Sequence, residues 1–157
     1  MNQGTILIVD DNEDVLFALN LLLKPHFRKV KVSTTPDRIA QFMESDDPDV
    51  ILLDMNFSRD ASSGQEGMEV LHDILKRDAE AVVVMMTAYS DMSKAINAIK
   101  AGATDFVAKP WENEKLIATL TAAAKLRQAR REKASLQKQV EGMAESSVPP
   151  IIGRSGA

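Results

Sequence analysis

The chain alternates between short apolar runs and longer segments in which apolar residues recur every three or four positions. The short runs predict five strands, at residues 5–9, 29–33, 50–53, 81–86 and 105–108. Because the clearest of these runs do not alternate with polar residues, we expect strands buried on both faces, as in parallel sheets. The three-and-four spacing predicts five helices, at residues 15–23, 36–44, 70–75 and 92–99 and from about 112 onward.

Five strands alternating with five helices predict an α/β fold with a doubly wound, five-stranded parallel sheet covered by helices on both faces. We expect the flavodoxin-like strand order 2-1-3-4-5, with an extended C-terminal helix. Ligands of such sheets bind beyond the carboxyl ends of the strands. The polar segment 57–67 follows the third strand directly. It is either a rim of that site or a mobile loop without a function of its own.

Composition narrows the classes of protein that fit. A length of 157 residues suits one domain with an appendage. The absence of Cys excludes disulfides and thiol chemistry, and two histidines, His26 and His72, exclude a multi-histidine zinc site. A net charge of −4 argues against a chain-wide nucleic-acid surface. No apolar run is long enough to span a membrane, so we expect a cytoplasmic protein without membrane contact.

Polar side chains stand where four of the predicted strands end. Asp10 and Asp11 follow the first strand, Asp54 the third, Thr87 the fourth and Lys109 the fifth. Each of them alone is more simply a helix cap, a turn residue or a solvated charge. In a doubly wound sheet, however, all five converge on one edge, where three carboxylates repel one another unless a cation neutralises them. The set therefore predicts a divalent cation site, and Mg²⁺ is the ion that carboxylate and water oxygens suit.

The same arrangement suits phosphoryl transfer, in which positioning and charge neutralisation matter more than covalent help. Asp54 is the expected nucleophile, because a carboxylate can form an aspartyl phosphate and this one ends a central strand. Asp10, Asp11 and Asp54 would hold the metal, with the backbone carbonyl of Asn56 as a further ligand. Thr87 would donate a hydrogen bond.

Four segments together resemble the receiver domain of two-component response regulators. They are Ile-Leu-Ile-Val-Asp-Asp ending at Asp11, Ile-Leu-Leu-Asp-Met-Asn around Asp54, Met-Thr-Ala-Tyr around Thr87 and Phe-Val-Ala-Lys-Pro ending at Pro110. The resemblance covers about residues 4–123. It implies that a histidine kinase phosphorylates Asp54, that the acidic pair binds Mg²⁺, and that Thr87 and Lys109 contact the phosphoryl group.

The resemblance also implies a cis bond between Lys109 and Pro110, which would aim the lysine into the site. Phe106 stands where the family has an aromatic residue that rotates on activation, although a plain core position is the alternative. One feature departs from the family pattern. The loop after the phosphorylated strand is longer than usual and lacks the usual proline.

The last predicted helix continues beyond the receiver-like part. Apolar positions step by three and four and form a seam that favours a parallel dimer, through Leu126, Ala129, Leu136, Val140 and Met143. A monomeric extension is the alternative. The same stretch is locally basic, with Lys125, Arg127, Arg130, Arg131 and Lys133. Without a recognition motif this indicates a solvated helix face, and we expect no direct contact with nucleic acid.

The final residues resemble the opening of the AAA+ ATPase module of sigma-54-dependent transcription activators of the nitrogen-regulator class. We therefore expect a receiver domain at 1–123, a helical dimerisation linker at 124–145 and the start of a truncated ATPase domain at 146–157. The downstream ATPase and DNA-binding domains would be absent from this fragment.

The expected function is a signalling switch rather than an enzyme: phosphorylation of Asp54 changes the dimer state of a transcription activator. Two alternatives remain. One is a single-domain receiver that acts by docking to a partner. The other is an aspartyl-phosphate hydrolase, although dehalogenase-type phosphatases place a second Asp where this chain has Asn56.

Overall fold

The computed structural model describes residues 4–55 and 65–147. Its elements follow the chain in the order β1 (Thr5–Val9), α1 (Glu13–Leu23), β2 (Lys29–Ser33), the 3₁₀ turn η1 (Pro36–Arg38), α2 (Ile39–Ser45), β3 (Val50–Asp54), α3 (Gln65–Arg77), β4 (Val83–Ala88), the 3₁₀ turn η2 (Tyr89–Asp91), α4 (Met92–Lys100), β5 (Asp105–Lys109) and α5 (Asn113–Ser147). By contact the chain divides into two units, residues 1–127 and 128–157.

The sheet has five parallel strands in the order β2-β1-β3-β4-β5, which confirms the predicted fold. β1 pairs on one side with β2 and on the other with the central strand β3, so that Ile8 stands between Val32 and Leu52. β4 then joins β3 to β5. This order brings the carboxyl ends of β1, β3, β4 and β5 to one edge of the sheet.

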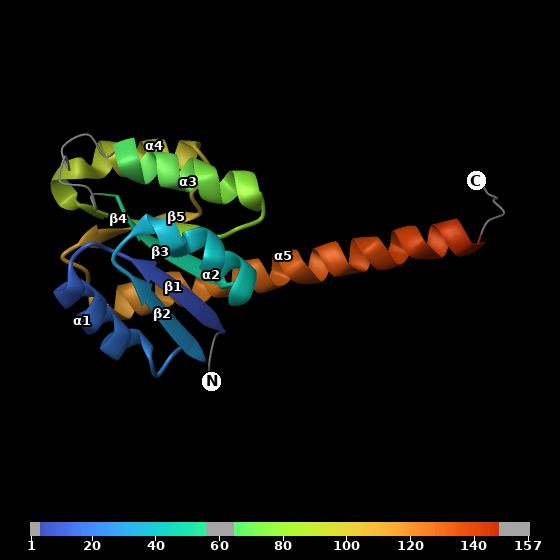
Figure 1. The fold of residues 1–157 in the computed structure, drawn as a ribbon, viewed down its shortest axis with the longest axis horizontal. Helices are drawn as coiled ribbons and strands as arrows, with labels where there is room; N and C mark the ends of the chain where they lie inside the picture. The colour runs from blue at the N-terminus through green and yellow to red at the C-terminus, as the bar shows by residue number, and fades with distance from the viewer. Residues whose placement is uncertain (1–3, 56–64, 148–157) are drawn as a thin grey trace. The chain divides into compact units, whose positions relative to one another are not determined.

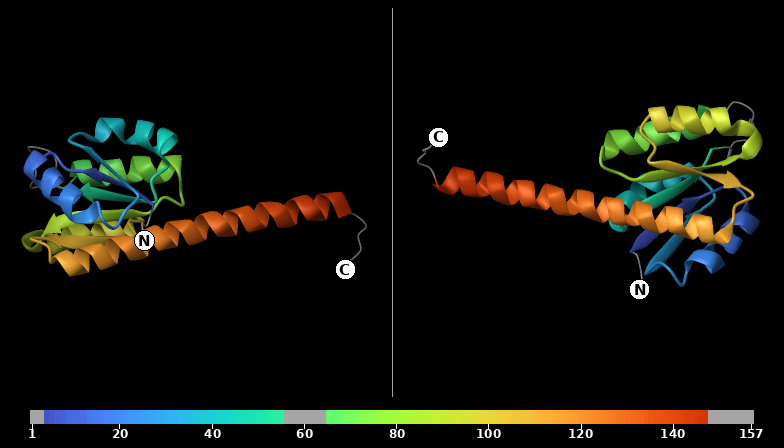
Figure 2. Two further views of the ribbon diagram at one scale, coloured as in Figure 1. Left: turned by 90° about the horizontal axis from the view of Figure 1, so that it is seen from below. Right: turned by 180° about the vertical axis from the view of Figure 1, so that it is seen from behind.

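Helices cover both faces of the sheet, and two apolar clusters fill the space beneath them. Figures 1 and 2 show α1 and the first half of α5 on one face, with α2, α3 and α4 on the other. Within β1, Ile6 and Ile8 belong to the first cluster, whereas Leu7 and Val9 belong to the second. Every residue of β1 and β3 is buried. Burial on both faces explains why their sequences are continuously apolar.

The second predicted helix begins differently from what its sequence predicts. Residues 36–38 form a 3₁₀ turn, and the α-helix runs only from Ile39 to Ser45. The Thr35 hydroxyl accepts a hydrogen bond from the backbone N–H of Asp37 and caps this tight turn at its proline end.

The fourth strand starts two residues later than predicted. Ala81 and Val82 are buried, but the N–H of Ala81 donates to the carbonyl of Asp78 and closes a turn. Ladder pairing with β3 begins at Val83, which stands opposite Ile51. The strand also ends two residues later than predicted, at Ala88, so Thr87 lies inside it rather than after it.

Most of the predicted polar loop 57–67 lies outside the described residues. Its C-terminal boundary is wrong, because α3 already begins at Gln65. Gly67 lies in the first turn of that helix directly against the backbone of Met55, where a Cβ would stand 2.8 Å from the carbonyl oxygen. This close approach brings the start of α3 against the residue that follows Asp54.

The last helix contributes to both units. In unit 1 its apolar side packs on the sheet through Leu116, Leu120, Ala123 and Ala124, with Ile117 half-buried beside them. In the second unit, residues 128–147 are helical. Among the described residues, no helix has the length and apolar character that crossing a membrane requires. The predicted domain boundaries at 123 and 145 stay predictions.

Candidate functional site

Three carboxylates meet at the carboxyl edge of the sheet. Asp10 directly follows β1, Asp11 is the next residue, and Asp54 is the last residue of the neighbouring strand β3. One oxygen from each lies within 4.8 Å of the others. Pairing of Val9 with Leu53 brings the two strand ends together. Asp10 and Asp54 are buried, whereas Asp11 is exposed.

Lys109 reaches this acidic group from the end of β5. Its Nζ lies 3.0 Å from Asp10 Oδ2 and 3.3 Å from Asp54 Oδ1. Burial alone would lower the pKa of Lys109, but the charges and hydrogen bonds of Asp54 and Asp10 outweigh it and raise the pKa above its ordinary value. The amine therefore stays protonated and bridges two carboxylates. The peptide bond between Lys109 and Pro110 is cis, as the family resemblance implies.

The single positive charge of the Lys109 ammonium group does not neutralise the negative charges of three carboxylates. Burial, followed by the neighbouring charge of Asp10, raises the pKa of Asp11, although Lys109 acts in the opposite direction. At an effective dielectric of 20, like charges 4 Å apart repel by about 4 kcal/mol. The site therefore has excess negative charge, and its all-oxygen donor set fits a hard divalent cation such as Mg²⁺.

Thr87 contributes a buried hydroxyl at the same end of the sheet. The residue is fully buried, and within the described part of the chain its Oγ1 has no hydrogen-bond partner. It comes one step after Met86, which stands opposite Asp54, and one step before Ala88, which stands opposite Lys109. Buried hydroxyls without a partner are rare in folded proteins. The Thr87 hydroxyl can therefore donate a hydrogen bond to a group that binds between the ends of β3 and β5.

Other predicted site residues fall outside this group. Asn56 lies outside the described residues. Phe106 is half-buried, pairs with Met85 across the strands and packs against the cluster beneath α3 and α4. That position fits a core residue and a switch residue equally well, so its role stays a prediction.

The predicted dimer seam lies along α5. Leu126 and Leu136 are exposed apolar residues on this helix, with 37% and 55% of their surface accessible. Ala129 is also exposed. The side chains of Val140 and Met143 lie outside the described part of the structure. Dimerisation through this helix stays a prediction.

Arg127 does not behave as the sequence predicts. We expected it on a solvated basic face, but only 8% of its surface is exposed. Its guanidinium group is paired with Asp78 and Asp47, which belong to two different loops. Local periodicity gives no signal for this burial, because both partners are distant in sequence.

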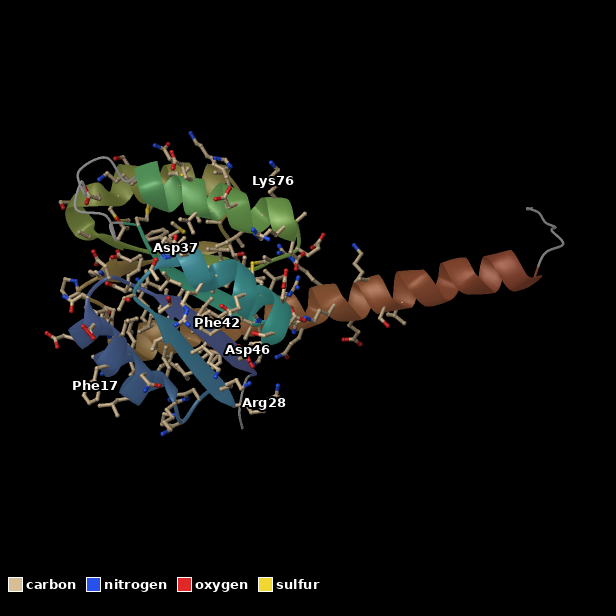
Figure 3. The ribbon with its side chains drawn as sticks, in the orientation of Figure 1. Phe17, Arg28, Asp37, Phe42, Asp46 and Lys76 are labelled. Atoms are coloured by element: carbon tan, nitrogen blue, oxygen red, sulfur yellow. The ribbon has the colours of Figure 1, made fainter. Side chains whose placement is uncertain are left out.

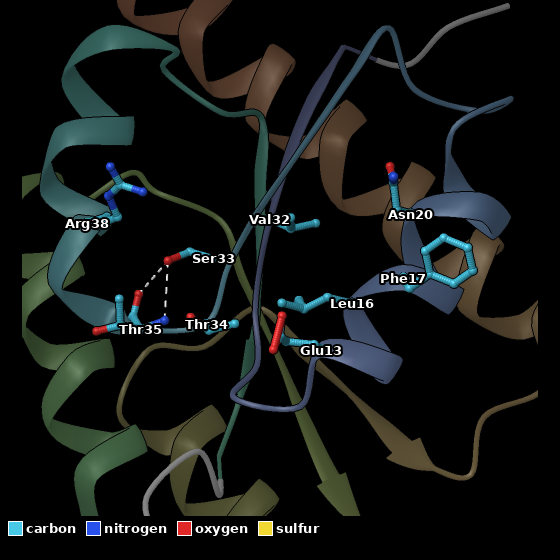
Figure 4. Close-up of a pocket in the computed structure, with 9 residues that line it drawn as sticks. All are labelled: Glu13, Leu16, Phe17, Asn20, Val32, Ser33, Thr34, Thr35 and Arg38. Carbon is cyan, nitrogen blue, oxygen red and sulfur yellow. Dashed lines mark hydrogen bonds between the residues drawn. The ribbon is translucent and has the colours of Figure 1, made fainter.

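A separate hollow of about 390 Å³ lies between α1 and the segment that follows β2 (Figure 4). Leu16 and Val32 are among the residues that line it, and Ser33 Oγ, also in the lining, donates to the carbonyl of Thr35. None of the carboxylates or the lysine described above lines it. The hollow is therefore not part of the acidic site.

Comparison with known proteins identifies the family to which this fold belongs. The family described as "Response regulator receiver domain" matches residues 6–121. A putative response regulator NtrX-like of Rickettsia bellii is 29% identical over 135 residues, which cover 86% of this chain and 28% of that protein. The DNA-binding transcriptional regulator NtrC of Escherichia coli is 27% identical over 123 residues, covering 78% and 25% respectively.

Among solved structures, the N-terminal signal receiver domain of a two-component system response regulator from Bacteroides fragilis is 46% identical, with a TM-score of 0.71. The match covers 77% of this chain and 96% of that domain. The chain thus spans less than a third of the NtrX-like and NtrC relatives but nearly all of an isolated receiver domain. On the sheet order, the acidic site and these matches, the chain belongs to the response regulator receiver domain family.

Proposed function

We propose that this receiver works by accepting a phosphoryl group on Asp54 from a partner histidine kinase. The observation that supports this most strongly is the meeting of three carboxylates within 4.8 Å of one another, beside the amine of Lys109. In the proposed step an Asp54 oxygen attacks the phosphorus of a phosphohistidine. The P–N bond breaks, the imidazole leaves and takes up a proton, and an acyl phosphate remains on Asp54. We further propose that this occurs in the cytoplasm, as the sequence predicts.

Asp10, Asp11 and Asp54 would hold Mg²⁺, with the backbone carbonyl of Asn56 as a further ligand. Bound there, the ion would neutralise charge on the transferring phosphoryl group. The excess negative charge of the site and the raised pKa of Asp11 support this assignment.

Lys109 and Thr87 would bind the phosphoryl oxygens. Lys109 already holds an Asp54 oxygen at 3.3 Å, so it lies within reach of a group attached to that carboxylate. The Thr87 hydroxyl is buried and has no hydrogen-bond partner among the described residues. A phosphoryl group would give this hydroxyl the partner that the described residues do not supply. The gain is realised only in the phosphorylated state, which is what a two-state switch requires.

Phosphorylation would then act on the linker. Thr87, Phe106 and Pro110 lie on β4, on β5 and directly after β5, next to α4 and the start of α5. We propose that they rearrange together and change the dimer state set by Leu126, Ala129, Leu136, Val140 and Met143.

The domain assignment goes with this proposal: a receiver at 1–123, a dimerisation linker at 124–145 and the opening of an ATPase module at 146–157. Residues 148–157 lie outside the described part of the chain. The match covers only 25% of the NtrC relative, which supports a natural protein with further domains. We propose that this protein is a sigma-54-dependent transcription activator.

Intact mass spectrometry after treatment with acetyl phosphate tests the proposal. With Mg²⁺ present we expect one added phosphoryl group on the parent chain, and none on Asp54→Asn or when the metal is chelated. Asp73→Asn, a change of the same kind on the exposed side of α3, is the matched control and should be phosphorylated like the parent. Rapid release of many phosphates per chain would instead indicate a hydrolase. No modification of the parent at all would contradict the proposal.

A further inference from the structure

Within unit 1, two kinds of contact attach the first part of α5 to the rest of the unit, and the second kind begins where the first ends. Its apolar contacts with the sheet reach as far as Ala124. In the next turn, Leu126 is exposed, whereas Arg127 is buried. The last turn of the helix within unit 1 is therefore attached through a charged side chain.

Arg127 joins the two helical layers of the domain. Its Nη2 lies 2.5 Å from Asp78 Oδ2, in the loop between α3 and β4, and 3.6 Å from Asp47 Oδ1, in the loop between α2 and β3. Those loops belong to the face of the sheet opposite α5. Both precede strands, so these contacts lie at the amino-terminal edge of the sheet, and Asp54 lies at the carboxyl edge.

The acidic partner is itself fixed in place. The N–H of Asp78 donates to the carbonyl of Ile74, and its own carbonyl accepts from the N–H of Ala81. Its Oδ1 accepts from the N–H of Glu80, which leaves Oδ2 for Arg127. A carboxylate held by its own turn gives the guanidinium one defined position.

These contacts fix the position of the α5 turn more than they raise the free energy of unfolding. Asp78 and Asp47 are 33% and 65% exposed, so water can solvate them if the arginine is removed. The Nε of Arg127 is buried and, among the described residues, has no hydrogen-bond partner. An apolar side chain of similar length would leave no such donor, and buried ion pairs are often replaced by apolar groups at little cost.

We propose that Arg127 is a positioning residue, which clamps the last turn of α5 in unit 1 to the α2–β3 and α3–β4 loops and so makes the linker respond to the receiver. The proposal rests on the proposed function, because it concerns the route by which phosphorylation of Asp54 changes the linker. Without the clamp, the first turn of the linker frays, and rearrangement of the receiver no longer reaches the rest of the linker.

Hydrogen exchange on the full chain tests the clamp itself. In Arg127→Met we expect the amides of residues 125–127 to exchange faster by about tenfold or more. These residues follow Ala124, the last apolar contact of the helix, and they open locally once the ion pairs with Asp78 and Asp47 are lost. Arg127→Lys should give a smaller increase, since one ammonium keeps the charge without the planar fork. Lys125→Met, at an exposed position of the same turn, is the control and should match the parent. Exchange in Arg127→Met within twofold of the parent would overturn the clamp.

Sedimentation before and after treatment with acetyl phosphate and Mg²⁺ tests the coupling. Arg127→Met should take up the phosphoryl group to the same extent as the parent but lose the change in self-association. An equal change in both chains would overturn the coupling and leave the proposed function intact. A phosphorylated parent whose self-association does not change would contradict the dimer switch and the coupling together. A parent that takes up no phosphoryl group would contradict the proposed function at its first step.

Discussion

At the scale of single residues, charge pairs stabilise the edge of the sheet away from the acidic site. Lys29 on the edge strand β2 places its Nζ 2.9 Å from Asp46 Oδ1, at the end of α2. Asp46 is labelled in Figure 3. The hydrogen bond from Lys29 lowers the pKa of Asp46 below its ordinary value. Because the folded pKa is depressed, this pair stabilises the fold above the unfolded pKa of 3.8, and the contribution is lost as pH falls through the folded value.

We therefore predict that Asp46→Asn lowers the free energy of unfolding at pH 7 by a small amount, as exposed pairs do. The difference from the parent should vanish in acid below the folded pKa, where both chains carry an uncharged side chain. Urea denaturation across the acid range measures this. Asp73→Asn, which has no ion pair among the described residues, should track the parent throughout. A deficit that persists unchanged in acid would show that the pair is not its cause.

Individual site residues were predictable when they ended an apolar run. Asp10, Asp54 and Lys109 stand at such places, and the parallel sheet brings them together. Arg127 was not predictable, because its burial depends on two loops that lie 80 and 49 residues earlier, at Asp47 and Asp78. Periodicity along α5 reports the apolar stripe of a helix and cannot report a loop that covers it.

At the scale of elements, the packing of α3 on β3 holds the residues around Asp54 in place. A Cβ on Gly67 would meet Met55 backbone atoms at 2.8 and 2.9 Å, closer than side chains tolerate. Backbone cannot move aside as the end of a flexible side chain can. The glycine therefore sets the distance between the first turn of α3 and the end of β3.

We predict that Gly67→Ala destabilises the chain by about 1–3 kcal/mol, the usual cost of overpacking, even though alanine is the better helix former. Because Met55 follows Asp54, the rate of phosphorylation should fall as well. Denaturation and timed mass spectrometry measure the two effects. His72→Ala, at an exposed position of the same helix, is the control for a general effect of substitution in α3. Unchanged stability in Gly67→Ala would contradict the close approach.

The first three strands were predicted best, and two of them, β1 and β3, are buried throughout. β1 and β2 have the predicted bounds, and β3 differs only by including Asp54. β4 starts later than predicted because Ala81 and Val82 are apolar and buried, although paired residues begin only at Val83 and Val82 contributes no more than its carbonyl, which accepts from the N–H of Ile51. The sequence does not predict the first turn of α3, because Gln65 and Glu66 are polar and Gly67 has no side chain. The three-and-four spacing of apolar residues that indicates a helix is therefore absent from that turn.

At the scale of the whole molecule, the proposed dimer switch depends on a helix that carries an exposed apolar seam. Leu136 has 55% of its surface exposed in the described part of α5. Burying a leucine contributes about 1.5–3 kcal/mol, and a symmetric dimer would bury two at each such position.

We predict that Leu136→Glu weakens self-association of the chain by tenfold or more, since about 1.4 kcal/mol corresponds to a factor of ten. Sedimentation equilibrium over a concentration series measures the dissociation constant. Ser135→Glu introduces the same charge at the neighbouring exposed position and should leave self-association close to that of the parent. Equal weakening by both changes would point to charge repulsion, and a parent that stays monomeric would contradict the dimer seam.

The position of the added phosphoryl group shows directly whether Asp54 is the phosphate acceptor. After treatment with acetyl phosphate and Mg²⁺, fragment mass spectrometry should locate the added phosphoryl group in the peptide that contains Asp54, with Asp10 and Asp11 unmodified. The chain has only two histidines, His26 and His72, and both should also be unmodified. A phosphoryl group on any residue other than Asp54 would contradict the account.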